Sequence, residues 1–311
     1  MTGVARTPLR AGRLAAVPAL LFALLATGAH AQTPEPNGAG VRSGVLPLKW
    51  QVSGPVCTGE SKFEVAPYNE DLYLLRESGC SNYEKPFVFL LFGADRVLLL
   101  DTGAGKSDIV AAVSGVIEGW LGRHGRESID LVVAHTHAHG DHTSGDEDFR
   151  KRPRTRVLDT TPAAVADFFG FHHWPDDTVT YDLGGRILDV IAIPGHEPSS
   201  IAIYDRQTGV LFTGDTLYPG RLYVRDAPAF AKSVARLVEF TRGKVVAHLL
   251  GNHIEEARTP YLDYPVGTVH QPDEHVLELG RGQLLELDAA LREMNGTLRR
   301  MALRDFTIWP K

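Results

Sequence analysis

The sequence predicts a layered α/β protein built around one large domain. Short apolar runs rich in branched and aromatic residues, such as 87–92 and 129–134, are typical of buried strands. Between these runs, residues 109–121 repeat apolar side chains at the spacing of one helix face. The chain has 311 residues, of which 43% are hydrophobic, so it can bury one extended core. Because polar loops follow several of the strands, we expect the functional residues at strand ends.

The first 31 residues have the composition of a signal peptide. Arg6, Arg10 and Arg13 precede an apolar run at 14–27, and small residues end the segment at Ala31. An uncleaved membrane anchor is the alternative, but the run is shorter than the roughly 20 residues that a spanning helix needs. We therefore expect a periplasmic or secreted protein with no stable membrane anchor after signal cleavage.

A flexible linker is expected at residues 32–55, because its first part is rich in proline and glycine. The folded domain then spans residues 56–311. It contains both cysteines of the chain, Cys57 and Cys80, and an oxidising compartment favours a disulfide between them. Two buried free thiols are the alternative.

The scaffold is expected to begin with one sheet and one helix. Four strand-like runs should form this first sheet, at residues 63–65, 72–75, 87–92 and 97–100. The helix at 107–121 would pack its apolar stripe on the sheet. A second amphipathic helix is expected at 228–240, following Asp226, because aspartate is a good N-cap residue.

The most informative segment follows the predicted strand at 129–134 and has the pattern His-x-His-x-Asp-His. Alternate residues of an extended segment point the same way, so His137 and His139 can bind one cation. Asp141 and His142 come after Gly140, which lets the chain turn them toward a second cation. Imidazole and carboxylate ligands suit zinc, and iron or manganese are also possible. A single structural zinc or a surface histidine cluster is the alternative.

Four residues cannot complete two coordination shells, so more ligands are expected elsewhere in the chain. Candidates follow three further strand-like runs, in Pro194-Gly-His196, in Thr213-Gly-Asp215 and at His253. All of them would lie in loops at strand ends, where they could meet the first cluster.

The order of these motifs resembles the metallo-β-lactamase superfamily over about residues 60–260. The resemblance implies an αββα four-layer sandwich, with two mixed sheets face to face and helices outside. It also implies that Asp101, in an Asp-Thr-Gly turn, supports the metal loop from behind the ligands. Carried over by position, the first metal would be held by His137, His139 and His196, the second by Asp141, His142 and His253, with Asp215 bridging both.

The resemblance further implies a metal-dependent hydrolase that uses a hydroxide shared by two divalent ions, with Asp141 as a catalytic residue that orients the hydroxide or passes on a proton. The pattern is most similar to the glyoxalase II and lactonase-like branches, because true β-lactamases carry Cys or Ser where this chain has Asp215. The expected substrate is a small ester, thioester or lactone. Glutathione thioesters are disfavoured, since the tail offers one helix, at about 283–301, in place of a helical domain. β-Lactam hydrolysis and an iron-dependent oxygen or redox module are the alternatives.

Four further residues are candidates for substrate contacts. His172 and His173 lie in an aromatic loop that could form a pocket wall. Arg221 could bind a substrate carboxylate and Tyr218 an oxyanion. A nucleic-acid substrate is excluded by the net charge of −6 and by the lack of basic runs interleaved with aromatics. The sequence leaves the oligomeric state open.

Overall fold

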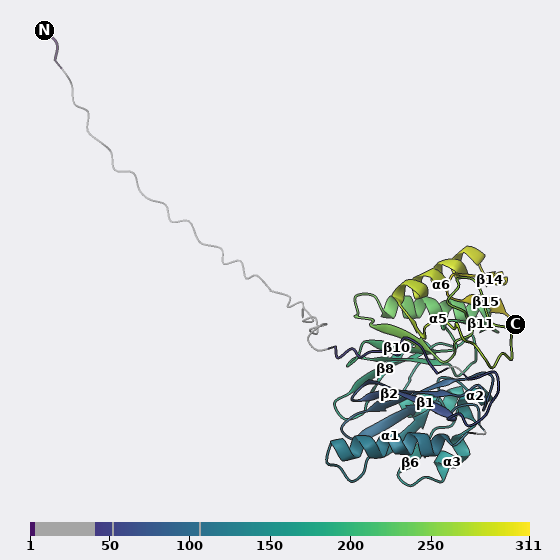
Figure 1. The fold of residues 1–311 in the computed structure, drawn as a ribbon. Helices are drawn as coiled ribbons and strands as arrows, with labels where there is room; N and C mark the ends of the chain where they lie inside the picture. Colours follow the sequence, from purple (N-terminus) through teal and green to yellow (C-terminus); the bar gives the residue numbers. More distant parts are fainter. Residues whose placement is uncertain (4–40, 52, 106) are drawn as a thin grey trace. The chain divides into compact units, whose positions relative to one another are not determined.

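The computed structural model describes residues 1–3, 41–51, 53–105 and 107–311. Most of the expected signal peptide and the start of the expected linker lie outside this range. In the described part of the chain, no helix has the length and apolarity that crossing a membrane requires. Residues 41–311 belong to one compact unit (Figure 1).

The first sheet is formed by the N-terminal half of this unit. Its strands lie in chain order and are β1 (Phe63–Asn69), β2 (Leu72–Glu77), β3 (Phe87–Phe92), β4 (Arg96–Leu100), β5 (Asp130–Ala134) and β6 (Thr155–Val157). The strands from β1 to β4 pair antiparallel, and β4, β5 and β6 run parallel. The four predicted strands and the strand before the histidine motif are therefore confirmed, in a mixed sheet.

The second sheet has the order β13-β12-β10-β9-β8-β7. Its strands are β7 (Thr178–Asp182), β8 (Ile187–Ala192), β9 (Ile201–Asp205), β10 (Val210–Gly214), β12 (His248–Gly251) and β13 (Glu278–Leu279). The pair β10 and β12 is parallel, while β7 to β10 alternate in direction. As a result β8, β10 and β12 run the same way and end at the same edge of the sheet.

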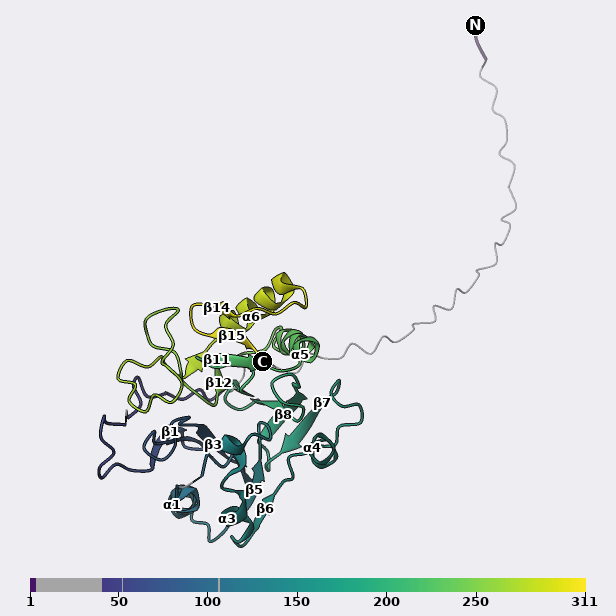
Figure 2. The ribbon, with the colours of Figure 1, turned by 90° about the vertical axis from the view of Figure 1, so that its right-hand side faces the viewer.

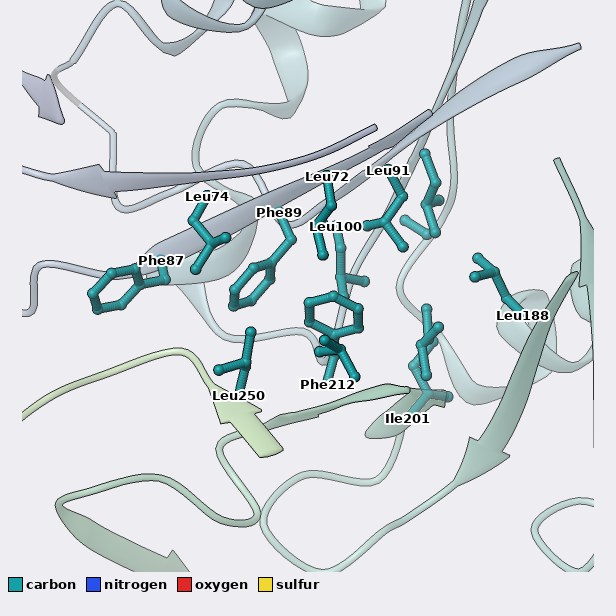
Figure 3. Packing of buried hydrophobic residues seen from close by; sticks show 14 of the residues in the cluster. Leu72, Leu74, Phe87, Phe89, Leu91, Leu100, Leu188, Ile201, Phe212 and Leu250 are labelled. Atoms are coloured by element: carbon teal, nitrogen blue, oxygen red, sulfur yellow. The ribbon is translucent and has the colours of Figure 1, made fainter. Parts of the chain in front are cut away.

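The two sheets face each other across a hydrophobic core (Figure 3). Phe89 from β3 and Phe212 from β10 have ring centroids 4.7 Å apart, and Leu74 and Leu250 lie in the same cluster. The outer face of the first sheet is covered by α1 (Ile109–Arg123), which buries one apolar stripe there.

Two helices cover the outer face of the second sheet. These are α5 (Ala227–Phe240) and α6 (Arg281–Met294). Figures 1 and 2 show the resulting order of helix, sheet, sheet and helices. The expected αββα sandwich is thus confirmed. Asp108 and Asp226 cap α1 and α5 by accepting backbone N–H hydrogen bonds.

The remaining elements include one sheet that the sequence did not predict. Three short helices connect the strands: α2 (Gly140–Thr143), α3 (Asp146–Arg150) and α4 (Pro162–Phe169). A three-stranded sheet joins β11 (Arg221–Val224), β15 (Thr307–Pro310) and β14 (Met301–Ala302). It can form because α6 ends at Met294, short of the expected end at residue 301. Asn295 and Gly296 adopt positive φ angles of 47° and 81°, which stop the helix.

The segment before β1 packs against the domain. Leu46 and Trp50 are buried, and the Trp50 ring contacts the Phe87 ring edge-on at 4.8 Å. This packing differs from the flexible linker expected up to residue 55, because two large apolar side chains of the segment find a place in the core. The expected disulfide between Cys57 and Cys80 is present.

Candidate metal centre

All seven residues that the sequence identified as metal ligands meet at one edge of the sandwich. Their ligand-type atoms form two groups, each with its atoms within 4.8 Å of one another. The histidine motif leaves β5 of the first sheet, and the other candidates leave β8, β10 and β12 of the second. The first group consists of His137, His139 and His196, and the second of Asp141, His142, Asp215 and His253.

Three histidine nitrogens of the first group converge. His139 Nδ1 lies 2.9 Å from His137 Nε2 and 3.0 Å from His196 Nε2. The opposite nitrogen of His196 lies 2.8 Å from the Tyr223 carbonyl oxygen, to which it can donate. That bond would leave Nε2 as the free acceptor, the form in which imidazole binds a metal.

The second group combines imidazole and carboxylate. Asp141 Oδ2 lies 3.1 Å from His142 Nε2 and 3.2 Å from His253 Nε2, and the two nitrogens are 3.4 Å apart. The other nitrogen of each ring faces an acceptor, Asp101 Oδ2 at 3.1 Å for His142 and the Glu84 carbonyl oxygen at 2.9 Å for His253. Both rings are therefore held in the orientation that a metal ligand needs.

Asp215 connects the two groups. Its Oδ2 faces the first group, 3.6 Å from His196 Nε2, and its Oδ1 faces the second, 3.4 Å from His253 Nε2. Oδ1 is buried and accepts no hydrogen bond from any described residue. A buried carboxylate oxygen without a hydrogen-bond partner is costly, and a cation between these ligands would reduce that cost. The donor set and this unsatisfied oxygen both fit divalent metal ions.

Asp101 lies behind the ligands, in the place that the resemblance implied. One oxygen accepts from the Thr136 backbone N–H at 2.7 Å, and the other accepts from the Thr136 hydroxyl and the Asn252 amide at 2.8 and 2.7 Å. Together with its contact to His142, these bonds join the loops after β4, β5 and β12. The sequence did not predict this role for Asn252, and its position next to His253 was the one signal that could have indicated it.

Opposing pKa shifts distinguish the two groups in the metal-free chain. Burial, together with repulsion from His142, lowers the pKa of His137. Burial also acts against charge on His253, but the carboxylates of Asp215 and Asp141 outweigh it and raise its pKa to about 9. His137 in the first group is thus neutral, the form in which imidazole binds a metal. The carboxylates of the second group favour positive charge, which a metal ion would supply.

A cavity of about 390 Å³ opens beside both groups. His139, Asp141, His196, Asp215 and His253 contribute to its wall. Other parts of the wall are residues 83–85 before β3, residues of β11 with Arg225 and Lys311, and the loop at 265–271. Gly140, Tyr218, Ile254 and Glu255 complete it. This volume is within the range of small-molecule sites. The wall residues before β3 and in the 265–271 loop were missed, because no motif of the sequence connects them to the histidines.

Two of the expected substrate contacts border the cavity, but their polar groups are already engaged. The Tyr218 hydroxyl donates to the Arg221 carbonyl oxygen, and its side chain is buried. The Arg221 guanidinium is bound to Glu255 at 2.7 Å and to Asp263 at 2.8 Å. Through these contacts both side chains hold the cavity wall together, and the roles in substrate binding stay a prediction.

His172 and His173 do not line the cavity. They are exposed residues between α4 and β7, where their backbone N–H groups donate to Asp177. The structure therefore does not place them beside the candidate metal ligands, and their contact with substrate stays a prediction. The neighbouring aromatics Phe171 and Trp174 pack against each other at the core instead.

Comparisons with known proteins agree with this geometry. Residues 84–247 match the family model of the metallo-β-lactamase superfamily. The hydroxyacylglutathione hydrolase of Chromohalobacter salexigens is 29% identical, over 70% of this chain and 84% of its own length. The human acyl-coenzyme A thioesterase MBLAC2 is 22% identical, over 59% of this chain and 78% of its own length.

Solved structures show the same fold. The metallo-β-lactamase FIM-1 from Pseudomonas aeruginosa superposes with a TM-score of 0.51 and 14% identity, covering 78% of this chain and 99% of that chain. A metallo-β-lactamase from Pontibacter korlensis gives a TM-score of 0.50 and 17% identity, covering 74% of this chain and 99% of that chain. The chain belongs to the metallo-β-lactamase superfamily, and it is a metal-dependent hydrolase.

Proposed function

We propose that this protein hydrolyses a small thioester, or a related ester or lactone, with two divalent ions, zinc being the first candidate. The observation that carries the proposal is the position of Asp215, whose two oxygens face two separate groups of ligand-type atoms. A carboxylate placed in this way can bridge two cations. The adjoining cavity leaves room for a small substrate beside both of them.

Two divalent ions held here would act as Lewis acids, lowering the pKa of a coordinated water to about 7 and polarising the acyl carbonyl. The side chains of the protein would position the reactants. Asp141 lines the cavity, and although burial opposes its ionisation, His142 and His253 hold its pKa well below the usual range. It is therefore ionised at neutral pH and can orient the attacking water by accepting a hydrogen bond.

The relatives favour a thioester among the possible acyl substrates. One is named a hydroxyacylglutathione hydrolase and another an acyl-coenzyme A thioesterase. Asp215, in place of the Cys or Ser of true β-lactamases, argues against β-lactam hydrolysis. The likeness to solved β-lactamases supports the fold alone. An iron-dependent oxygen or redox reaction is a further alternative, and metal analysis separates it from hydrolysis.

We also propose that the protein is exported to the periplasm or secreted, with residues 1–31 as its signal peptide. The disulfide between Cys57 and Cys80 supports this, because disulfides persist in oxidising compartments. Small molecules reaching that compartment would then be the available substrates.

The function is tested by metal analysis combined with a substrate panel of acyl thioesters, acyl-homoserine lactones and nitrocefin. We expect two zinc ions per chain and turnover of a thioester, ester or lactone. Asp215→Ala should lower kcat/KM at least about 100-fold and reduce the metal content, because it removes the bridging carboxylate.

Asp148→Ala is the matched control, since Asp148 is exposed and pairs with Lys151 at 2.8 Å, away from the cavity wall. Wild-type turnover by Asp215→Ala would refute the proposal. One bound iron without hydrolysis would favour the redox alternative, and cleavage of nitrocefin alone would favour the β-lactamase alternative.

A further inference from the structure

Lys85 is a buried cation in the wall of the cavity. Lys85 is only 4% exposed, yet it contributes to the cavity lining. The side chain passes close to Gly79, where an added Cβ would lie 3.0 Å from Lys85 Cδ. Its ammonium donates to the Thr268 carbonyl oxygen at 2.8 Å, across the gap between the β2–β3 connection and the 265–271 loop. Burial of a charged group at this depth requires compensation.

The compensation is incomplete within the described part of the chain. An ammonium has three donors, and the Thr268 carbonyl is the one described acceptor for Lys85. Within that same part, no carboxylate oxygen lies within 4.0 Å of Lys85 Nζ. Two donors of this buried cation therefore have no acceptor among the described residues.

The nearby acidic groups are already committed to other cations. Glu274 binds both Nη atoms of Arg76, with one of these contacts at 2.6 Å. Glu255 binds Arg221 at 2.7 Å, and Asp263 binds the same guanidinium. Arg76 and Arg221 thus each have a carboxylate partner, which Lys85 lacks.

The surroundings of Lys85 connect it to the candidate metal ligands and to the cavity. The preceding residue, Glu84, offers its carbonyl oxygen to His253 Nδ1 at 2.9 Å, so the backbone here contacts a candidate metal ligand. Lys85 itself has a φ of +48°, an uncommon conformation that persists where the surroundings hold it in place. Gln271 lines the same cavity, and its buried Oε1 has no hydrogen-bond partner among the described residues.

We infer that Lys85 binds an anionic oxygen group, such as a carboxylate, on the non-reacting part of the substrate. This inference rests on the proposed function and narrows its substrate class to small acyl compounds that carry a negative charge. The anionic group would accept hydrogen bonds from the two Lys85 N–H groups that do not bind Thr268. The Gln271 side-chain oxygen could accept a hydrogen bond from a neighbouring donor of the same ligand. Burial, together with the charge of Arg76, lowers the pKa of Lys85 to about 8, as expected for a cation without a counter-ion.

The test compares two thioesters that differ only in charge, S-acetylthioglycolate and its neutral amide, with thiol release as the measurement. The proteins are the zinc-loaded full chain and its Lys85→Gln and Lys85→Arg variants. In Lys85→Gln, KM for the charged thioester should rise about 10-fold or more with little change in kcat, because a charge-assisted hydrogen bond is lost. Kinetics with the amide should stay within about twofold of wild type, and Lys85→Arg should recover part of the loss.

Binding of succinate to the metal-free protein, measured by calorimetry, gives a readout that does not depend on turnover. Lys85→Gln should weaken it about 10-fold or more, whereas Lys151→Gln, which removes an exposed lysine, should not. Equal losses with both thioesters, or unchanged succinate binding in Lys85→Gln, would overturn the inference. If no thioester, ester or lactone is cleaved but succinate binding depends on Lys85, the proposed function fails and the anion site stands.

Discussion

Asp101 shows how much of the site depends on a residue that need not touch a metal. It is completely buried and faces hydrogen-bonding groups of Thr136 and His142, which follow β5, and of Asn252, which follows β12. Burial by itself would raise its pKa, but the neighbouring His142 and His135 hold that pKa well below its usual range, so the residue is ionised. Its charge fixes the His142 ring and favours the imidazole orientation that faces the second group.

Asp101→Asn tests this role. The substitution keeps the size of the side chain but removes its charge and replaces one acceptor by a donor. We expect metal affinity to fall about 10–100-fold, as is usual when a partner of a ligating histidine is lost. Competition with a zinc chelator measures the change, and Asp95→Asn, at an exposed aspartate, is the control. An unchanged zinc affinity would show that the other bonds suffice to hold His142.

At the scale of elements, the site depends on how closely a helix packs on a strand-end loop. Gly195, between β8 and His196, has a φ of +142°, and an added Cβ would lie 2.4 Å from the Phe230 Cα of α5. The Gly195 carbonyl oxygen also accepts the N–H groups of Arg225 and Asp226 at 3.0 and 2.9 Å. These contacts fix the position of the His196 loop relative to the start of α5.

Gly195→Ala should displace this loop, because neither the backbone conformation nor the contact with α5 leaves room for a methyl group. We expect loss of metal from the first group and a turnover at least about 10-fold lower. Gly115→Ala is the matched control, since Gly115 lies on the exposed side of α1 with open space at its Cβ position. That change should instead stabilise the protein by about 0.5–1 kcal/mol. Equal zinc content and turnover in both variants would contradict the argument.

At the scale of the whole domain, the N-terminal segment and the cavity wall are joined covalently. Cys57 lies in the segment before β1, and Cys80 begins the stretch that leads to Glu84 and Lys85. Ser53 and Ser78 form a further contact across the same junction, with hydroxyl oxygens 3.2 Å apart. Because the Glu84 carbonyl oxygen orients His253, the disulfide restrains a segment that supports the second metal group.

Replacing both cysteines by serine should lower the free energy of unfolding by about 3 kcal/mol, the value expected for closing a loop of roughly 20 residues. Chemical denaturation of the double variant measures this, with reduced wild-type protein as an independent comparison. We also expect weaker zinc binding, because the 80–85 stretch loses an anchor. A double variant with wild-type stability and zinc affinity would show that packing of the N-terminal segment is sufficient.

The features that could be predicted are those encoded by short stretches of chain. Strand periodicity identified the first sheet, the apolar stripe identified α1, and Asp226 as an N-cap residue helped to identify α5. The spacing of His137, His139, Asp141 and His142 identified a site with two groups. Local signals failed where long-range contacts decide, as in the third sheet, where β15 returns to pair with β11. The early end of α6 has a local cause, since Asn295 and Gly296 stop the helix although the apolar pattern continues.

The sequence by itself determined which residue types could bind metals, their order along the chain, and the layered fold that brings strand ends together. Only the tertiary structure decided which cations of the cavity wall remain open to a ligand. Arg221 met two carboxylates from the 255–263 stretch, whereas Lys85 met a single carbonyl oxygen. The reason is physical: whether a charge is neutralised depends on which partners folding places within a few ångströms of it, and the partner of Lys85 is 183 residues away in the sequence.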